Sequence, residues 1–321
     1  MAMTMQTGSK DITLAKLFEK FMAYKKIDNV AEDTVIYYDK CFKTFCEFYD
    51  SQNMCSEISK DICLEYVSFL RAKNTMKDVT INTRLRGIRA ILYYGMEHGY
   101  ISEFKVRLIK ADKEIKETYT DEELLRLLKK PDTKTCDFTE YRNWVIINYL
   151  LATGNRLSTV TNLKIEDIVL ADGMIMLKKT KNRKQQIIPL SNTMIKILQE
   201  YLEFRQGNPS DYLFCNRFGN QFTRGGFETA ILDYNRSRGV QKRSVHLFRH
   251  TFAKKWILNG GDIFRLQKIL GHSSLEIVKE YLNFFGTDLQ QQFNDFNPLE
   301  NIYSDNNLHS NKALSLTRKK K

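Results

Sequence analysis

The stretch from Ser244 to Tyr281 constrains this chain most strongly, because it carries histidine, arginine and tyrosine side chains at fixed intervals between patterns typical of helices. His246 and Arg249 lie three positions apart, at the start of a run whose apolar residues recur at helical spacing. Side chains with this spacing leave the same face of a helix. We therefore expect a helix that directs both polar groups into a cleft.

A second helix follows this one and leads to the tyrosine. A pair of glycines interrupts the first pattern, and Asp262 is placed to cap the next helix. Gly271 ends that helix and presents His272, and Tyr281 follows near the end of a short helical pattern. We interpret the Tyr281 hydroxyl as the nucleophile of an enzyme.

Two basic groups precede this stretch. The apolar run 141–152 predicts a central buried helix, and Gly154 permits a tight bend that presents Arg156 at the helix end. Further along, 174–177 and 186–190 have the pattern of short strands and predict a β-hairpin. Six cationic side chains crowd its turn region, and for nearly all of them we expect phosphate contact: Lys178, Lys179, Lys181, Arg183, Lys184 and, on the far side of the sheet segment, Lys164.

The motifs HLFRHTFA, LGHSS and EYLNF, in this order, resemble the C-terminal motif set of the tyrosine recombinases, the phage-integrase superfamily. LLATGNRLSTVTNL around Arg156 is similar to the first arginine motif of this superfamily, and KTKNRKQQIIPL matches its β-hairpin lysine at Lys181. A register shift of two or three residues would give the role of the lysine to Lys179 or Lys184. Thr159 stands where the superfamily usually has an acidic residue, a departure that affects the accessory hydrogen bond of that residue but not the arginine.

The resemblance implies one catalytic set: Arg156, Lys181, His246, Arg249, His272 and Tyr281. Cleavage of a DNA phosphodiester needs an in-line nucleophile, charge stabilisation on the non-bridging oxygens and a proton for the leaving 5′-oxygen. The phenol supplies the first and the two guanidinium groups supply the second. Lys181 would supply the proton as the general acid, His246 would position the phosphate or accept the tyrosine proton, and His272 would add a hydrogen bond. We expect neither a metal nor a cofactor, because no His, Asp and Glu spacing resembles a metal site.

The composition agrees with a nucleic-acid partner without requiring one. The chain has 321 residues, 42% of them hydrophobic, which leaves room for two domains with their own cores. Its net charge of +12 predicts a polyanionic partner, either nucleic acid or an anionic membrane surface, although a merely basic protein would show the same charge. The six cysteines form no CxxC pair, and neither a signal peptide nor a long apolar span is visible. We expect a reduced cytoplasmic protein of a bacterium, associated with the nucleoid when bound to DNA and not with a membrane.

Four helical patterns precede residue 103, and the last one turns Arg84, Arg86 and Arg89 partly outward. Such arginines fit a solvated basic face and a DNA-gripping surface equally well, because guanidinium pairs bidentately with phosphate. The similarity of TINTRLRGIRAILYYGMEHGYI to the last helix of the recombinases' core-binding domain favours DNA. The expected DNA-binding residues are Arg84, Arg86, Arg89, Lys179, Arg183 and Lys184.

We expect a mainly α fold with two domains. The divisions are a flexible lead at 1–10, a helical core-binding domain at 11–103, an extended and mobile linker at 104–117, an α-rich catalytic domain with a small antiparallel β-sheet at 118–300, and a disordered basic tail at 301–321. Asp11 is expected to cap the first helix. A capping box formed by Thr120 and Glu123 marks the start of the second domain.

The resemblance implies a site-specific DNA recombinase that cleaves and rejoins strands through a covalent 3′-phosphotyrosine. Its partners would be double-stranded recombination sites, other copies of the chain in a synaptic tetramer, and an accessory DNA-bending or directionality protein. The segment 287–299 resembles the C-terminal helix that family members pass to a neighbouring subunit. Integration and excision of a mobile element is the biological role that we favour.

Three alternatives stay open. Xer-type resolution of chromosome or plasmid dimers fits the compact chain, in which no additional N-terminal domain is visible. A type IB topoisomerase shares the arginine, lysine, histidine and tyrosine chemistry, but it would relax DNA as a monomer without a specific site. An inactive DNA-binding accessory protein would have lost the nucleophile, and the intact set of six residues argues against it.

Overall fold

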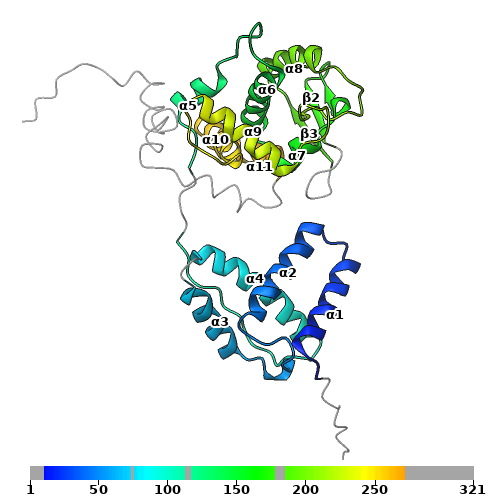
Figure 1. The fold of residues 1–321 in the computed structure, drawn as a ribbon, viewed down its shortest axis with the longest axis vertical. Coiled ribbons are helices and arrows are strands. Elements are labelled where there is room, and N and C mark those ends of the chain that lie inside the picture. Colours follow the sequence, from blue (N-terminus) through cyan, green and yellow to red (C-terminus); the bar gives the residue numbers. More distant parts are fainter. Residues whose placement is uncertain (1–10, 74–75, 113–116, 178–184, 272–321) are drawn as a thin grey trace, which may run out of the picture. The chain divides into compact units, whose positions relative to one another are not determined.

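The computed structural model describes residues 11–73, 76–112, 117–177 and 185–271. The chain forms two compact units, Met1–Glu114 and Ile115–Lys321, each of which is described by itself (Figure 1). Helices dominate the described residues of both units, and one small antiparallel sheet lies in the second. The predicted mainly α fold is thus confirmed.

Four α-helices and one short 3₁₀ helix build the described part of the first unit. They are α1 (Leu14–Ile27), α2 (Glu32–Cys46), η1 (Cys55–Glu57), α3 (Lys60–Ala72) and α4 (Asp78–Glu97). Each α-helix turns an apolar stripe inward, so that Leu17, Phe45, Leu70 and Ile91 are fully buried in a common core. The four predicted helices are therefore confirmed.

The first helix is capped by a different residue from the one that the sequence suggested. The Thr13 hydroxyl accepts a hydrogen bond from the Lys16 backbone amide at 3.3 Å and caps α1. Asp11 instead accepts hydrogen bonds from the Ser56 amide at 3.3 Å and from the Ser56 hydroxyl at 2.6 Å. Capping by Asp11 was wrong because this longer-range contact holds its carboxylate.

Residues 104–112 form neither helix nor strand, and they pack against the first unit. Val106 is 3% exposed and belongs to the core of that unit. The Asn82 side chain donates to the Ile109 carbonyl oxygen at 2.9 Å and accepts from the Ile109 amide at 3.0 Å. The sequence therefore placed the end of the first folded unit too early, because alternating buried side chains in an irregular segment leave no helical stripe.

The second unit begins with α5 (Asp121–Leu128), for which the predicted capping box of Thr120 and Glu123 is present. It continues with α6 (Phe138–Thr153), α7 (Leu157–Asn162), η2 (Ile165–Asp167), β1 (Ile168–Val169), β2 (Met174–Leu177), β3 (Gln186–Pro189), α8 (Asn192–Arg205), α9 (Arg224–Ser237), α10 (His246–Leu258) and α11 (Ile263–Leu270). The strands pair antiparallel in the order β1-β2-β3, with Leu177 opposite Gln186. The predicted hairpin is thus confirmed on both sides of its turn.

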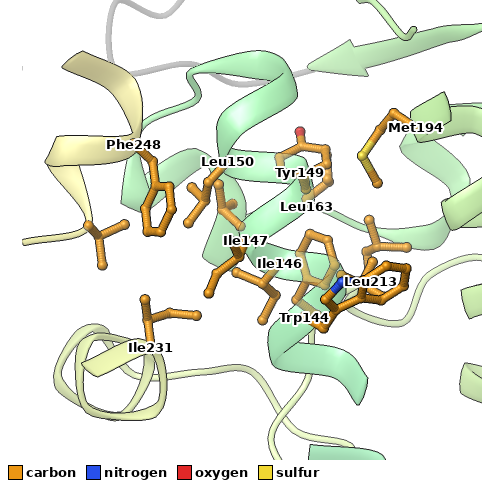
Figure 2. Close-up of a cluster of buried hydrophobic side chains, with 14 of the residues drawn as sticks. Trp144, Ile146, Ile147, Tyr149, Leu150, Leu163, Met194, Leu213, Ile231 and Phe248 are labelled. Carbon is orange, nitrogen blue, oxygen red and sulfur yellow. The ribbon is translucent and has the colours of Figure 1, made fainter. Parts of the chain in front are cut away.

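Helix α6 runs through the core of this unit. Its residues Ile146, Ile147 and Tyr149 are fully buried, and Ile231 of α9 and Phe248 of α10 belong to the same cluster (Figure 2). A helix that is apolar on nearly every face needs partners all round, and α8, α9 and α10 supply them. Among the described residues, no helix is both long and apolar enough to cross a membrane.

Candidate active site

Gly154 makes the sharp turn that presents Arg156. It caps the C-terminus of α6 in the left-handed conformation, with φ of 61°, which favours glycine. A Cβ atom at this position would lie 2.6 Å from a ring carbon of Phe252 and 2.8 Å from Leu270 Cδ2. Both the backbone conformation and the close approach of α10 and α11 therefore require glycine here, and Arg156 follows as the residue that precedes α7.

The two predicted arginines meet at one backbone carbonyl group. Arg249 on α10 is 5% exposed and donates from Nη1 to the Gly154 carbonyl oxygen and from Nη2 to the Leu270 carbonyl oxygen, both at 2.8 Å. Arg156 donates from Nη1 to the same Leu270 oxygen at 3.2 Å. Two guanidinium groups from distant parts of the sequence are thereby brought to a common point.

The carbonyl group at which the two arginines meet belongs to Leu270, the last residue of helix α11. Asp262 caps its N-terminus by accepting from the Arg265 amide at 2.8 Å, as predicted. Gly271 ends it in the left-handed conformation, with φ of 62°. The last carbonyl groups of a helix lack helical donors and carry partial negative charge, so positive side chains are stabilised there.

His246 is the first residue of α10, and the charges of these arginines affect the pKa of its ring. The residue as a whole is exposed, yet partial burial of its ring lowers the pKa of His246 below its usual value, and the charges of Arg249, Arg224 and Arg156 lower it further. The imidazole is consequently neutral near pH 7. In this form one ring nitrogen is free to accept a proton or a hydrogen bond.

Arg224 is a member of this basic group that the sequence did not reveal. It is the first residue of α9, and its Nε lies 3.3 Å from Glu228 Oε1. The sequence of 223–239 shows only an amphipathic helical pattern, which does not distinguish Arg224 from other surface residues. The position of the α9 N-terminus relative to His246 is a property of the tertiary fold, which no local signal in the sequence encodes.

The other half of the predicted set lies outside the described residues. This applies to Lys181, His272 and Tyr281, and to the proposed phosphate contacts Lys179, Arg183 and Lys184. The structure describes the elements that flank them, because β2 ends at Leu177, β3 begins at Gln186 and α11 ends at Leu270. Arg156, His246 and Arg249 are therefore the part of the candidate site whose geometry is defined.

Comparison with known proteins decides the family. The chain matches the phage integrase family over residues 117–285 and the phage integrase SAM-like domain over residues 13–113. The chain belongs to the phage integrase family.

Its relatives include tyrosine recombinases from several bacteria. Tyrosine recombinase XerD of Staphylococcus haemolyticus is 30% identical over 221 residues, which cover 66% of this chain and 74% of the relative. XerD of Listeria innocua is 24% identical over 296 residues, which cover 88% of this chain and 98% of the relative. The predicted membership of the tyrosine recombinases is confirmed, and with it site-specific recombinase activity.

Solved structures share the fold. The Tn1549 transposon integrase in complex with transposon right-end DNA superimposes with a TM-score of 0.72 at 19% identity, covering 88% of this chain and 99% of that chain. The XerH recombinase bound to a palindromic difH substrate gives a TM-score of 0.69 at 22% identity, covering 87% of this chain and 84% of that chain. The architecture of this integrase-family chain is therefore that of the tyrosine recombinases.

The three arginines of the first unit that were predicted to bind DNA differ in exposure. Arg86 is exposed, whereas Arg84 and Arg89 are half-buried. Arg84 Nη1 lies 4.0 Å from Cys41 Sγ, and its buried Nε has no hydrogen-bond partner among the described residues. Helices α2 and α4 approach closely here, since a Cβ atom at Gly87 would lie 2.4 Å from Cys41 Sγ. Arg84 is thus part of the packing between these helices, and Arg86 offers the accessible charge.

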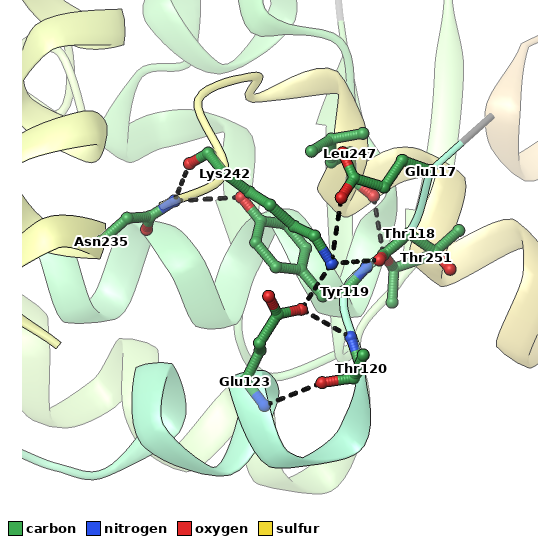
Figure 3. A network of polar contacts seen from close by, with 9 residues as sticks. All are labelled: Glu117, Thr118, Tyr119, Thr120, Glu123, Asn235, Lys242, Leu247 and Thr251. Atoms are coloured by element: carbon green, nitrogen blue, oxygen red, sulfur yellow. Dashed lines mark hydrogen bonds and ion pairs between the residues drawn. The ribbon is translucent and has the colours of Figure 1, made fainter. Parts of the chain in front are cut away.

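A polar network fixes the start of the second unit to the helix that carries His246 and Arg249 (Figure 3). The Tyr119 amide donates to the Thr251 hydroxyl at 2.9 Å, and that hydroxyl donates to the Leu247 carbonyl at 2.8 Å within α10. Lys242 Nζ donates to Glu123 Oε2 at 2.6 Å. Burial alone would raise the pKa of Glu123, but the hydrogen bond from Lys242 and the capping contacts of Thr120 hold it below its usual value.

The described residues contain no group of three or more His, Cys, Asp and Glu side chains arranged to hold a metal ion. Thr159, which replaces the usual acidic residue, is half-buried on α7. The hydrogen bonds described for Arg156 and Arg249 run to the carbonyl oxygens of Gly154 and Leu270. Backbone oxygens thus contribute to orienting the two guanidinium groups.

Proposed function

We propose that this chain cleaves and rejoins double-stranded DNA at specific sites, with Tyr281 as the nucleophile that forms a covalent 3′-phosphotyrosine. The observation that carries this proposal is the convergence of Arg156 and Arg249 on the Leu270 carbonyl oxygen, beside His246. An anion placed beside the two guanidinium groups would be stabilised by their permanent positive charges and could accept hydrogen bonds from their remaining N–H groups. A scissile phosphate in a transition state is such an anion.

Each residue has a defined role in this reaction. The Tyr281 oxygen attacks phosphorus in line, the bond from phosphorus to the 5′-oxygen breaks, and Lys181 donates the proton that the leaving oxygen takes. Arg156 and Arg249 hold the non-bridging oxygens, and His272 adds a hydrogen bond to them. Neutral His246 accepts the tyrosine proton or positions the phosphate. A strand with a free 5′-hydroxyl then reverses these steps and rejoins the DNA.

The same proposal covers DNA binding and assembly. The first unit acts as a core-binding domain that grips phosphates through Arg86 and Arg89, and the catalytic domain extends from 118 to 300 with Lys179, Arg183 and Lys184 as further contacts. The chain works as a synaptic tetramer that exchanges the segment 287–299, in the bacterial cytoplasm, with an accessory protein controlling direction. The net charge of +12 supports binding to a polyanion, and a similar structure, that of lambda integrase, is a tetramer on a Holliday junction.

Integration and excision of a mobile element is the role that we favour. The similarity to a transposon integrase structure supports it. Xer-type dimer resolution is the second candidate, since several relatives are XerD and XerC recombinases. Recombination assays with candidate element ends and with dif-like sites would separate the two, because the true substrate gives joined products and the other does not.

The proposed nucleophile is tested with nicked candidate DNA, which traps a covalent adduct because a short cleaved fragment diffuses away. We expect an adduct with the wild-type chain and none with Tyr281→Phe. Tyr303→Phe is the matched control, because it removes the next tyrosine along the chain and should leave the adduct unchanged. An adduct that persists in Tyr281→Phe would show that another residue attacks. Relaxation of supercoiled plasmid lacking any site would point to a type IB topoisomerase instead.

A further inference from the structure

One side chain, Gln186, joins the hairpin of the proposed general acid to the end of α11. Gln186 begins β3, opposite Leu177 at the end of β2. Its Nε2 donates to the carbonyl oxygens of Lys268 and Ile269, each at 2.6 Å. The side chain also fills the space beside Gly271, where a Cβ atom would lie 2.9 Å from Gln186 Oε1. The first residue of β3 is thus hydrogen-bonded to the last turn of a helix far along the sequence.

The carbonyl groups at this helix end are shared among donors with different roles. The Gly271 amide closes the helix on Gln267 and Lys268 in the usual way. The Gln186 side chain donates hydrogen bonds to the carbonyl oxygens of Lys268 and Ile269. The side chains of Arg156 and Arg249 donate to the carbonyl oxygen of Leu270. Because adjacent peptide groups in one turn move together, the carbonyl that orients both arginines belongs to the turn that Gln186 holds in place.

We propose that Gln186 is a positioning residue for the arginine pair: it fixes the last turn of α11, and so the Leu270 carbonyl oxygen at which Arg156 and Arg249 meet. This inference rests on the proposed function, since it assigns to Gln186 a part in preparing that site. Gln186 is uncharged and half-buried, and its side-chain amide donates to backbone oxygens of α11. Its loss should therefore slow the chemical step and leave affinity for DNA almost unchanged.

The test uses the chain of 321 residues and three variants of it. Gln186→Leu removes the donor at similar size, and Gln186→Arg restores a donor in a half-exposed position. Gln221→Leu is the matched control, because Gln221 Nε2 also donates within this unit, to Asn162 Oδ1 at 2.9 Å and to the Thr161 carbonyl at 3.3 Å, away from the arginine pair. Single-turnover adduct formation at saturating nicked DNA gives the rate, and titration of the same DNA gives the dissociation constant.

We expect Gln186→Leu to lower the single-turnover rate about tenfold, as for the loss of a hydrogen-bonded contact, with no matching change in the dissociation constant. Gln186→Arg should recover most of the rate, and Gln221→Leu should keep the wild-type rate. An unchanged rate in Gln186→Leu overturns the proposal. So does a slow Gln186→Arg variant, or a rate that falls only in step with affinity or thermal stability.

A second measurement is independent of cleavage. The Nε–H resonances of Arg156 and Arg249, assigned in the free protein by nuclear magnetic resonance, should broaden or shift in Gln186→Leu and not in Gln221→Leu. If the wild-type chain formed no adduct, the proposed function would fail, while these resonances would still decide whether Gln186 positions the arginines. Resonances that do not change in Gln186→Leu contradict the positioning role whatever the activity.

Discussion

Two arginines of the second unit are almost fully buried, and their surroundings distinguish a structural charge from a functional one. Arg142 on α6 is 2% exposed. Its Nη1 donates to the Cys215 carbonyl oxygen at 2.9 Å and its Nη2 to Asn143 Oδ1 at 2.8 Å, and the guanidinium carbon lies 4.6 Å from the ring centre of Phe222. Neutral oxygens and an aromatic face surround one charge, which is the arrangement of a group that joins parts of a core.

Arg249 is 5% exposed and also donates to backbone oxygens, but a second guanidinium and an imidazole lie beside it. Arg156 shares its acceptor, and the pKa of His246 is lowered by burial and further by the charges of both arginines. Two like charges held near one point repel each other, and an anion bound beside them would reduce that repulsion. Convergence of like charges, rather than burial alone, is therefore the feature on which the proposed site rests.

The largest effect that this comparison predicts is on catalysis by Arg249→Ala. The rate of adduct formation should fall by about 10²–10³-fold, because one donor to the developing charge on the phosphate is lost. Single-turnover assays on nicked DNA measure it, with DNA binding measured in parallel. A variant that cleaves at the wild-type rate would remove Arg249 from the site.

The substitution Arg142→Met should lower the stability of the protein and leave the rate of cleavage almost unchanged. The free energy of unfolding should fall by about 2 kcal/mol, because the buried oxygens of Cys215 and Asn143 lose their donors, while the folded fraction cleaves at nearly the wild-type rate. Denaturant unfolding gives the stability, and the adduct assay is run below the unfolding transition. Loss of cleavage in a stable Arg142→Met protein would break the distinction between the two arginines.

Titration of the His246 imidazole measures the effect of the positive charges around it. Its pKa is lowered from the usual value of 6.5, so the C2 proton of its ring should titrate below pH 6.5 in the free protein. Replacing Arg224 by Gln removes a positive neighbour, which should raise this pKa. Because the unfolded chain binds the proton more readily, His246 should also lower stability as pH falls through 6.5. A pKa that stays the same in Arg224→Gln would place that arginine away from the imidazole.

The smallest effect concerns the first unit, in which Arg86 is exposed and Arg84 is packed against Cys41. Arg86→Gln should reduce the slope of log affinity against log salt by about 0.9, the value for one phosphate contact. Arg84→Gln should leave the slope unchanged and lower thermal stability. Binding to a DNA duplex at several salt concentrations measures both slopes, and equal slopes in the two variants would show that exposure does not decide which arginine meets phosphate.

Much of this structure follows from local sequence patterns. The periodic apolar stripes predicted the helices, and Gly154, Gly271 and the capping box of Thr120 and Glu123 predicted where several begin and end. The motifs also placed Arg156 and Arg249 in one site before any geometry was known. These features are local or are carried by spacing, so they can be read along one chain.

The rest depends on contacts between distant segments. Asp11 has the chemistry of a helix cap but is held by Ser56. Residues 104–112 look like a linker until Asn82 binds the backbone of Ile109. Gln186 shows no signal in the sequence, because its partners are backbone oxygens of α11. Backbone acceptors have no side-chain identity, and the sequence cannot reveal which of them a polar residue will find.

The central claim is that Arg156 and Arg249 hold one phosphate for attack by Tyr281. An experimental structure of the Tyr281→Phe chain bound to its nicked recombination site tests it most directly. We predict that both guanidinium groups donate hydrogen bonds to non-bridging oxygens of the same scissile phosphate. Guanidinium groups bound to two different phosphates, or directed away from the DNA, would contradict the account.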